Sequence, residues 1–160
     1  MNLLVAGGLF AAVMIAAPAS AQTVMTDFAF DDLRSVLADL KDTVTDEDTN
    51  SEGVHFIEVK TEGGLSYVVY GRQCATEKPL RCTGAQVMSS FTIKSARLDE
   101  AIEAIDYAAV SDFAEDGEVK ISRYLIFDGG ITRENLKTNL TVFRSIADKT
   151  WDLLTDGGYF

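Results

Sequence analysis

Two cysteines are the residues whose chemistry the sequence specifies most directly. Cys74 and Cys82 are the only cysteines of the 160-residue chain, and they bracket the segment ATEKPLR, whose proline and charges are typical of a surface turn. In an oxidising compartment we expect a disulfide between them, worth about 2 to 3 kcal/mol of stability. A redox role is the alternative, because Arg72, Lys78 and Arg81 lie nearby. The spacing is not C-x-x-C, however, and no helix N-terminus is expected to lower a thiol pKa.

A partial calcium-loop pattern precedes the cysteines. Asp46, Asp48 and Asn50 occupy the first three ligand positions of such a loop. Ser51 then stands where the turn glycine belongs, and an isoleucine stands where the bidentate glutamate belongs. We therefore interpret residues 42–53, DTVTDEDTNSEG, as a solvated loop and expect no metal there.

The single histidine, His55, has no second histidine with which to hold a metal and no nearby nucleophile to activate. We expect an ordinary histidine at the end of a strand. The chain also lacks a Walker or Rossmann glycine loop, a G-x-S-x-G elbow and an H-E-x-x-H motif. The sequence therefore gives little support for an enzyme, and we expect no cofactor.

The charge of the chain disfavours two classes of partner. The sequence has 14 Lys and Arg against 25 Asp and Glu, a formal net charge of −11. Such a surface repels nucleic acid and anionic lipid headgroups. Because 47% of the residues are hydrophobic, the chain is expected to fold rather than remain a disordered acidic polymer.

The first 21 residues are predicted to be a signal peptide. Residues 3–17 are apolar or glycine, a length too short to span a bilayer, and Ala19-Ser20-Ala21 matches a cleavage site. A retained membrane anchor is the alternative, since the segment before the apolar run carries no basic side chain. We expect cleavage after Ala21, a periplasmic or secreted protein with no membrane attachment, and one domain over residues 22–160.

The alternation and the helical spacing of apolar residues predict the secondary structure of most of the mature chain. Residues 27–43 have the apolar spacing of one helix face. Residues 54–61 and 65–72 form a predicted hairpin around Glu62-Gly63-Gly64, and residues 84–93 a third strand. A second helix is expected over residues 98–109.

A loop over residues 111–117 and a last strand over residues 118–127 follow. Arg123 shares a face with apolar residues of that strand. We expect it to pair with a carboxylate at the sheet edge; the alternative is that it points into a ligand groove.

The end of the chain has the clearest local signals. Tyr124 belongs to the aromatic and branched run YLIF, which predicts a buried strand, and Asp128-Gly129-Gly130 predicts a tight turn. Thr132 is placed to cap an amphipathic helix of about five turns, whose apolar stripe runs from Leu136 to Trp151 and beyond.

The string RYLIFDGGITRENLKTNLTVF resembles the closing strand, turn and final helix of the YbjN family, described as bacterial sensory-transduction regulators. The resemblance extends over the mature chain, including Tyr70-Gly71 and the cysteine pair. It implies an α+β fold like that of type III secretion chaperones: a four-stranded antiparallel sheet packed against helices, in the order α-β-β-β-α-β-α.

These observations together predict a non-catalytic, exported binding or regulatory module that holds a peptide or protein partner. The family fold also implies a homodimer as one possible assembly. Arg123, Tyr124 and Trp151 are the candidate partner-binding residues. Two alternatives stay open: a thiol-redox protein that uses Cys74 and Cys82, and a passive structural protein of the cell envelope.

Overall fold

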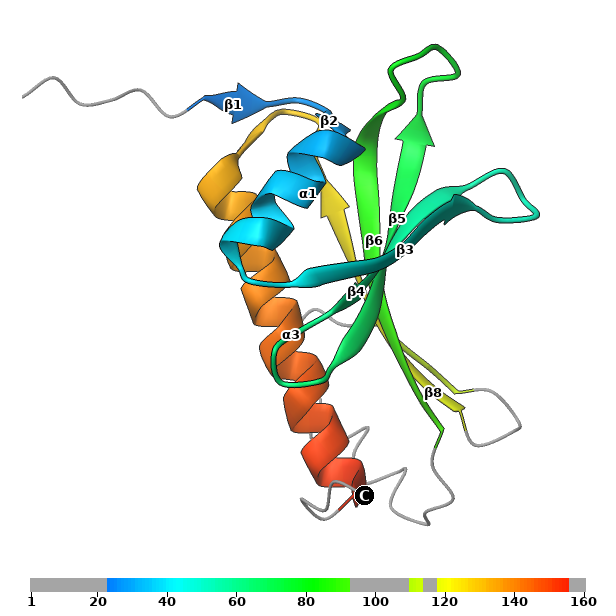
Figure 1. Cartoon of the computed structure of the whole chain (residues 1–160), viewed down its shortest axis with the longest axis vertical. Helices are drawn as coiled ribbons and strands as arrows, with labels where there is room; N and C mark the ends of the chain where they lie inside the picture. Colours follow the sequence, from blue (N-terminus) through cyan, green and yellow to red (C-terminus); the bar gives the residue numbers. More distant parts are fainter. Residues whose placement is uncertain (1–22, 93–109, 114–117, 156–160) are drawn as a thin grey trace, which may run out of the picture.

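A computed structural model describes residues 23–92, 110–113 and 118–155, which form a main antiparallel sheet, a separate two-stranded ladder and two helices on one face of the main sheet (Figure 1). The α+β class predicted from the sequence is confirmed. The predicted signal peptide and the predicted helix over residues 98–109 lie outside the described residues.

The main sheet is larger than the four strands expected. Its strands follow the order β3-β4-β5-β6-β8-β7, and β2 pairs with β6 beside this path. A two-stranded ladder joins β1 to β9. The bounds are β1 Val24–Met25, β2 Phe28–Ala29, β3 Thr43–Thr49, β4 His55–Lys60, β5 Ser66–Cys74, β6 Arg81–Thr92, β7 Val110–Phe113, β8 Glu118–Ile126 and β9 Ile131–Thr132.

Two of the additional strands replace predicted loops. Strand β3 lies where a solvated loop was expected, and β7 overlaps the start of the predicted loop over residues 111–117. Both are edge strands, each paired with a single neighbour. An edge strand can expose both faces to water, so β3 lacks the apolar alternation that identifies a strand in sequence.

Helix α1, Phe30–Asp39, is shorter than the predicted helix over residues 27–43. It starts late because Phe28 and Ala29 are still extended and pair with β6. Its first turn is held by Asp32, whose carboxylate accepts a hydrogen bond from the Ala29 N–H at 2.9 Å. It ends before Lys41, whose φ of 59° is left-handed.

Helix α3, Arg133–Thr155, follows the turn predicted at Asp128-Gly129-Gly130. Gly129 and Gly130 have φ values of 84° and 91°, which side chains with a β-carbon rarely adopt. The predicted cap is confirmed, because the Thr132 hydroxyl accepts a hydrogen bond from the Asn135 N–H at 3.1 Å. No helix among the described residues is long and apolar enough to cross a membrane.

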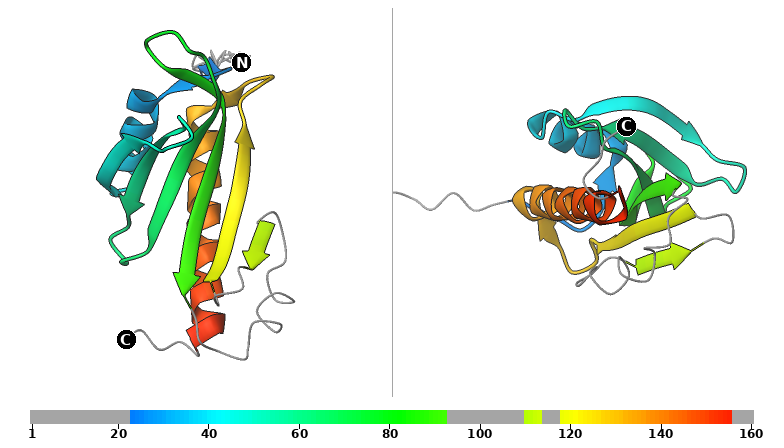
Figure 2. Two further views of the ribbon diagram at one scale, coloured as in Figure 1. Left: turned by 90° about the vertical axis from the view of Figure 1, so that its right-hand side faces the viewer. Right: turned by 90° about the horizontal axis from the view of Figure 1, so that it is seen from below.

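Figure 2 shows the helices against one face of the twisted sheet. The buried apolar side chains that form the core lie between them. Buried side chains of α3, among them Leu140 and Phe143, meet buried residues of the central strands such as Val69 and Ile121. Burial of this apolar surface is the main stabilising term of the fold.

One polar cluster is buried where the elements meet. The Asp42 side chain, fully buried, accepts a hydrogen bond from the Tyr67 hydroxyl at 2.6 Å and forms an ion pair with Arg144 of α3 at 3.2 Å. Burial and the neighbouring carboxylate raise the pKa of Tyr67, so its hydroxyl stays protonated and donates. The cluster ties the end of α1 to β5 and α3.

Candidate functional site

The face of the sheet opposite the helices is the first candidate site, and we call it the open face. Directly opposed residues of antiparallel strands share a face, so the register assembles rows of side chains on it. One row runs Asp48, Phe56, Tyr70, Gln86, Tyr124 across β3, β4, β5, β6 and β8. The next row runs Asp46, Glu58, Val68, Met88, Ser122. Ile126 follows at the end of β8, in a row with Gly84 and Arg72.

Large apolar side chains lie partly uncovered on the open face. Tyr124 is 48% exposed and Ile126 is 63% exposed. The rings of Phe56 and Tyr70, an opposed pair, have centroids 5.9 Å apart. Among the described residues, no element covers this side of the sheet, so these side chains are available to a partner.

Two polar side chains fix the centre of the open face. The guanidinium of Arg72 lies 5.3 Å from the centroid of the Tyr70 ring. Its Nε also donates a hydrogen bond to Gln86 Oε1 at 3.1 Å. These contacts hold the middle of the row in place, so the surface is preorganised rather than loose.

Acidic residues form one margin of the open face. Asp46 and Asp48 of β3 and Glu58 of β4 lie beside the apolar rows, and all three are exposed. Glu58, Val68 and Met88 line a shallow cleft of about 220 Å³. The face also carries basic residues: Arg72 lies beside Tyr70, and Lys60 and Lys120 are opposed to Ser66 and Ser90 of the cleft lining.

The three partner-binding residues predicted from the sequence do not lie together. Tyr124 is on the open face, whereas its neighbour Arg123 is half-buried on the core side of β8, opposite Val87. Trp151 lies on α3. Among the described residues, no carboxylate forms an ion pair with Arg123, so the structure does not give it the partner expected at the sheet edge. Arg123 and Tyr124 point to opposite faces because successive residues of a strand alternate, and Trp151 belongs to α3, on the other side of the sheet from Tyr124.

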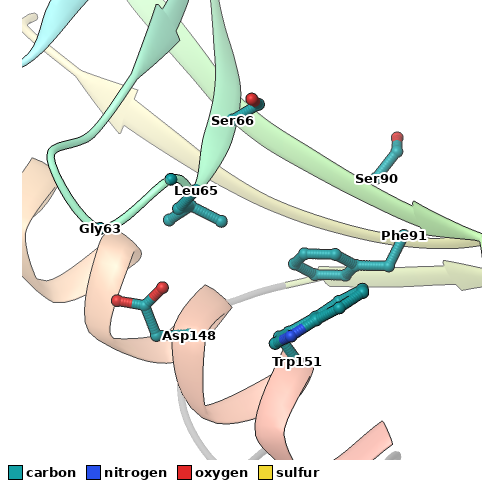
Figure 3. A pocket seen from close by; sticks show the side chains of 8 residues that line it. Gly63, Leu65, Ser66, Ser90, Phe91, Asp148 and Trp151 are labelled. Carbon is teal, nitrogen blue, oxygen red and sulfur yellow. The ribbon is translucent and has the colours of Figure 1, made fainter. Parts of the chain in front are cut away.

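Trp151 lines a second candidate site, a cleft of about 260 Å³ at the end of the sheet (Figure 3). The loop between β4 and β5 forms one wall through Gly63 and Leu65, and α3 forms the other through Asp148 and Trp151. The Trp151 ring lies against Phe91 of β6, with ring centroids 5.5 Å apart. Figure 3 shows the Asp148 carboxylate pointing across the cleft towards Leu65.

The histidine is part of a polar cluster that the sequence did not reveal. His55 Nε2 lies 2.9 Å from Glu47 Oε1, and its Nδ1 lies 3.1 Å from the hydroxyl of Thr49. The other carboxylate oxygen of Glu47 binds Arg34 of α1, which also pairs with Asp31. Burial raises the pKa of Glu47, but the hydrogen bonds from His55 and Arg34 outweigh it and lower that pKa.

This cluster has the residue types of a hydrolytic triad, but its bonds have a structural explanation. Thr49 and His55 are directly opposed in the ladder of β3 and β4, and Glu47 lies two residues before Thr49. Arg34 then ties this hairpin to α1. The cluster therefore fastens an otherwise weakly packed edge strand to the helix. It was missed because Glu47 was assigned to a loop.

The disulfide predicted between Cys74 and Cys82 is present. The two residues are an opposed pair of β5 and β6, and Cys82 is fully buried against the core. The bond lies directly over Gly71, where an added β-carbon would come within 2.7 Å of Cys82 Sγ and 2.8 Å of Cys74 Sγ. Its sulfurs are thus packed within the sheet rather than presented on a loop.

The described residues hold no group of three or more histidine, cysteine or carboxylate side chains placed to bind a metal ion. Asp46 and Asp48, two positions of the partial calcium pattern, instead accept hydrogen bonds from the N–H groups of the residues that follow them. Asp46 and Asp48 are two residues apart in β3, so both side chains lie on the open face.

The large apolar residues of the open face were also missed by sequence reasoning. Phe56, Tyr70, Met88 and Ile126 come from four strands, so their proximity depends on register. One signal was available: in the alternation of β6, Met88 lies on the same side as the polar residues Gln86 and Ser90, where a polar residue would be normal.

Comparisons of the chain with protein-family models, with curated protein sequences and with solved structures find no match. The resemblance to the YbjN family therefore stays a prediction from the sequence.

Proposed function

We propose that this protein is an exported, non-catalytic binding module that holds a segment of a protein partner on its open face. The observation that carries the proposal is the band of partly exposed rings and aliphatic side chains, including Tyr70, Tyr124 and Ile126, on a sheet face that the described helices leave uncovered. Exposed aromatic side chains of this kind are typical anchors of protein interfaces.

The shape of the face favours a polypeptide over a small molecule. Small-molecule sites are concave, whereas the open face is a broad surface over several strands with only a shallow cleft at Met88. A chain lying across it can place one side chain in that cleft and others on the Tyr124 and Ile126 side chains.

The charge of the face indicates the chemistry of the segment. Asp46, Asp48 and Glu58 border the apolar rows, and the whole chain carries a formal charge of −11. A segment with basic residues next to apolar residues is complementary to such a surface, and the attraction speeds its association. Acidic segments are repelled.

Strand addition at the sheet edge is the less favourable mode of binding. The edge strand β3 carries Asp46, Glu47 and Asp48 and has a bulge between Val44 and Asp46. Charges and bulges are the devices by which proteins prevent edge pairing. The opposite edge, β7, has only four residues.

The disulfide supports a location in an oxidising compartment, as expected for a periplasmic or secreted protein. There the protein would act as a chaperone-like adaptor or as a regulator that responds through its partner. A homodimer built through the open face is the competing assembly.

The proposal is tested by crosslinking the tagged mature protein in its own compartment, capturing it and identifying the attached proteins. Replacement of Tyr124 and Ile126 by serine should abolish capture of the partner. Val142→Ser is the matched control, because Val142 is an exposed apolar residue of α3, 39% exposed, outside the open face. Equal capture by both variants would contradict the proposal, and a crosslink only between copies of the chain would replace it with the dimer.

A further inference from the structure

The cleft between the β4–β5 loop and α3 has features of its own that the open face does not explain. It has a volume of about 260 Å³ and is lined by residues that include Leu65, Phe91, Asp148 and Trp151. This volume lies below the range of sites for drug-sized molecules, so the cleft is matched to a ligand of a few heavy atoms.

One side of the cleft is an aromatic wall. Phe91 is 7% exposed and belongs to the core, while Trp151 is half-buried and packs against it at an interplanar angle of 46°. Anchored rings of this kind present fixed π-faces. The electron-rich face of an indole attracts a cation more strongly than that of any other side chain.

Asp148 supplies a negative charge beside this wall. It lies three residues before Trp151, so the two side chains share a face of α3, as Figure 3 shows. Burial raises the pKa of Asp148; Arg144 opposes this effect and Asp152 adds to it. Arg144, the cation one turn earlier, directs its ion pair to Asp42 instead, at 3.2 Å. The Asp148 side chain is exposed at the rim of the cleft, and no described cation lies within ion-pair distance of it.

The residues that line the cleft also restrict the charge of the ligand. It contains glycines, serines, apolar side chains and one carboxylate, but no lysine, arginine or histidine. An anion would find no charged partner there, and a metal ion would find a single carboxylate where hard cations need several oxygen ligands. A neutral apolar ligand would make no use of the carboxylate.

We infer that this cleft binds a small organic cation, an alkylammonium compound, with its charge between the Asp148 carboxylate and the Trp151 ring and its alkyl groups against Phe91 and Leu65. This inference does not depend on the proposed function of the open face. It gives the protein a small-molecule site in addition to the surface for a protein segment.

The chain offers a direct probe of this site, because Trp151 is its only tryptophan. Intrinsic fluorescence of the purified mature protein is titrated with choline and, separately, with 3,3-dimethyl-1-butanol, the neutral carbon analogue of choline. We expect a saturable change of tryptophan emission with choline and binding of the neutral analogue weaker by about tenfold, the size expected for a partly desolvated cation–π and ion-pair contact.

Asp148→Asn should weaken choline binding by about threefold to fivefold and leave the affinity for the neutral analogue unchanged, because the Trp151 ring still favours the cation. Glu134→Gln is the matched control, since it removes an exposed carboxylate from the other end of the same helix and should leave the titration unchanged. Circular dichroism verifies that both variants are folded. No saturable change with choline, equal binding of choline and its analogue, or an Asp148→Asn protein that binds choline like the wild type would each overturn the inference.

Discussion

The phenol ring of Tyr124 lies against Gly84 of the neighbouring strand. A β-carbon at Gly84 would come within 2.7 Å of the Tyr124 hydroxyl and 3.1 Å of two of its ring carbons. The glycine thus makes room for the ring of Tyr124, which packs against the sheet. Gly71, on the core side of the same sheet, makes room for the disulfide in the same way.

Substitution of these two glycines by alanine is predicted to have different consequences. Gly84→Ala should cost less than about 1 kcal/mol, because Tyr124 can swing into solvent, whereas Gly71→Ala should cost about 2 to 3 kcal/mol, because buried sulfurs and Phe30 cannot move aside. Chemical denaturation measures both values. Gly84→Ala should also lower partner capture while the fold is retained. Equal losses of stability at both sites would contradict this account of the packing.

The disulfide is predicted to be a structural bond. Reduction should lower the free energy of unfolding by about 2.5 kcal/mol, the value expected from loop entropy for a ring of this size. Urea denaturation with and without a phosphine reductant measures the change, and a double variant with alanine at Cys74 and Cys82 should not respond to the reductant. A wild-type protein that loses no stability on reduction would favour the thiol-redox alternative.

The buried ion pair of Asp42 and Arg144 is predicted to matter for stability. Arg144→Met would leave the fully buried Asp42 carboxylate without its cation, and we expect a loss of about 2 to 3 kcal/mol because Arg144 itself is 25% exposed and partly hydrated. Lys149→Met, at an exposed position of the same helix, should change stability by less than about 0.5 kcal/mol. Similar losses in both variants would show that the Asp42 ion pair contributes no more than an exposed charge.

Acid is predicted to weaken the fold in part through Glu47. Its pKa is lowered from the ordinary value of 4.5 by its bonds to His55 and Arg34, which outweigh the effect of burial. The folded protein therefore binds fewer protons at this group, so its contribution to stability is present above pH 4.5 and is lost as the pH falls through the lower, folded pKa.

Glu47→Gln should accordingly be less stable than the wild type at neutral pH and lose less stability between about pH 5 and about pH 3. Denaturation midpoints over this range measure the slope. Glu52→Gln, an exposed position in the loop after β3, is the control. A slope for Glu47→Gln as steep as that of the wild type would show that the cluster does not hold the hairpin.

Parts of this fold could be predicted from the sequence because their signals are local. The turn at Gly129-Gly130 and the cap at Thr132 depend on residues only a few positions apart, and the structure contains both. The buried stripe of α3 follows from helical spacing alone. The disulfide followed from the cysteine pair and the expected compartment.

Other parts depend on partners distant in sequence. Apart from Val44, which packs against the core, strand β3 is polar on both faces, so its pairing with β4 and the ties from Glu47 to Arg34 and His55 largely make it a strand. The open face exists because register aligns Phe56, Tyr70 and Tyr124, and no local pattern encodes that register. The alternation of the predicted strand already places Arg123 and Tyr124 on opposite faces; only the position of the helices shows that Tyr124 lies on the uncovered face.

The open face is tested most directly by a photo-activated crosslinking residue at a single position. Placed at Ile126, it should capture a specific protein in the native compartment; placed at Val142, the exposed apolar control on α3, it should not. A synthetic peptide of the captured segment should carry basic and apolar residues and bind the purified protein with an affinity that falls as salt is raised. Capture at Val142 as strong as at Ile126, no capture at either, or an acidic captured segment would contradict the account.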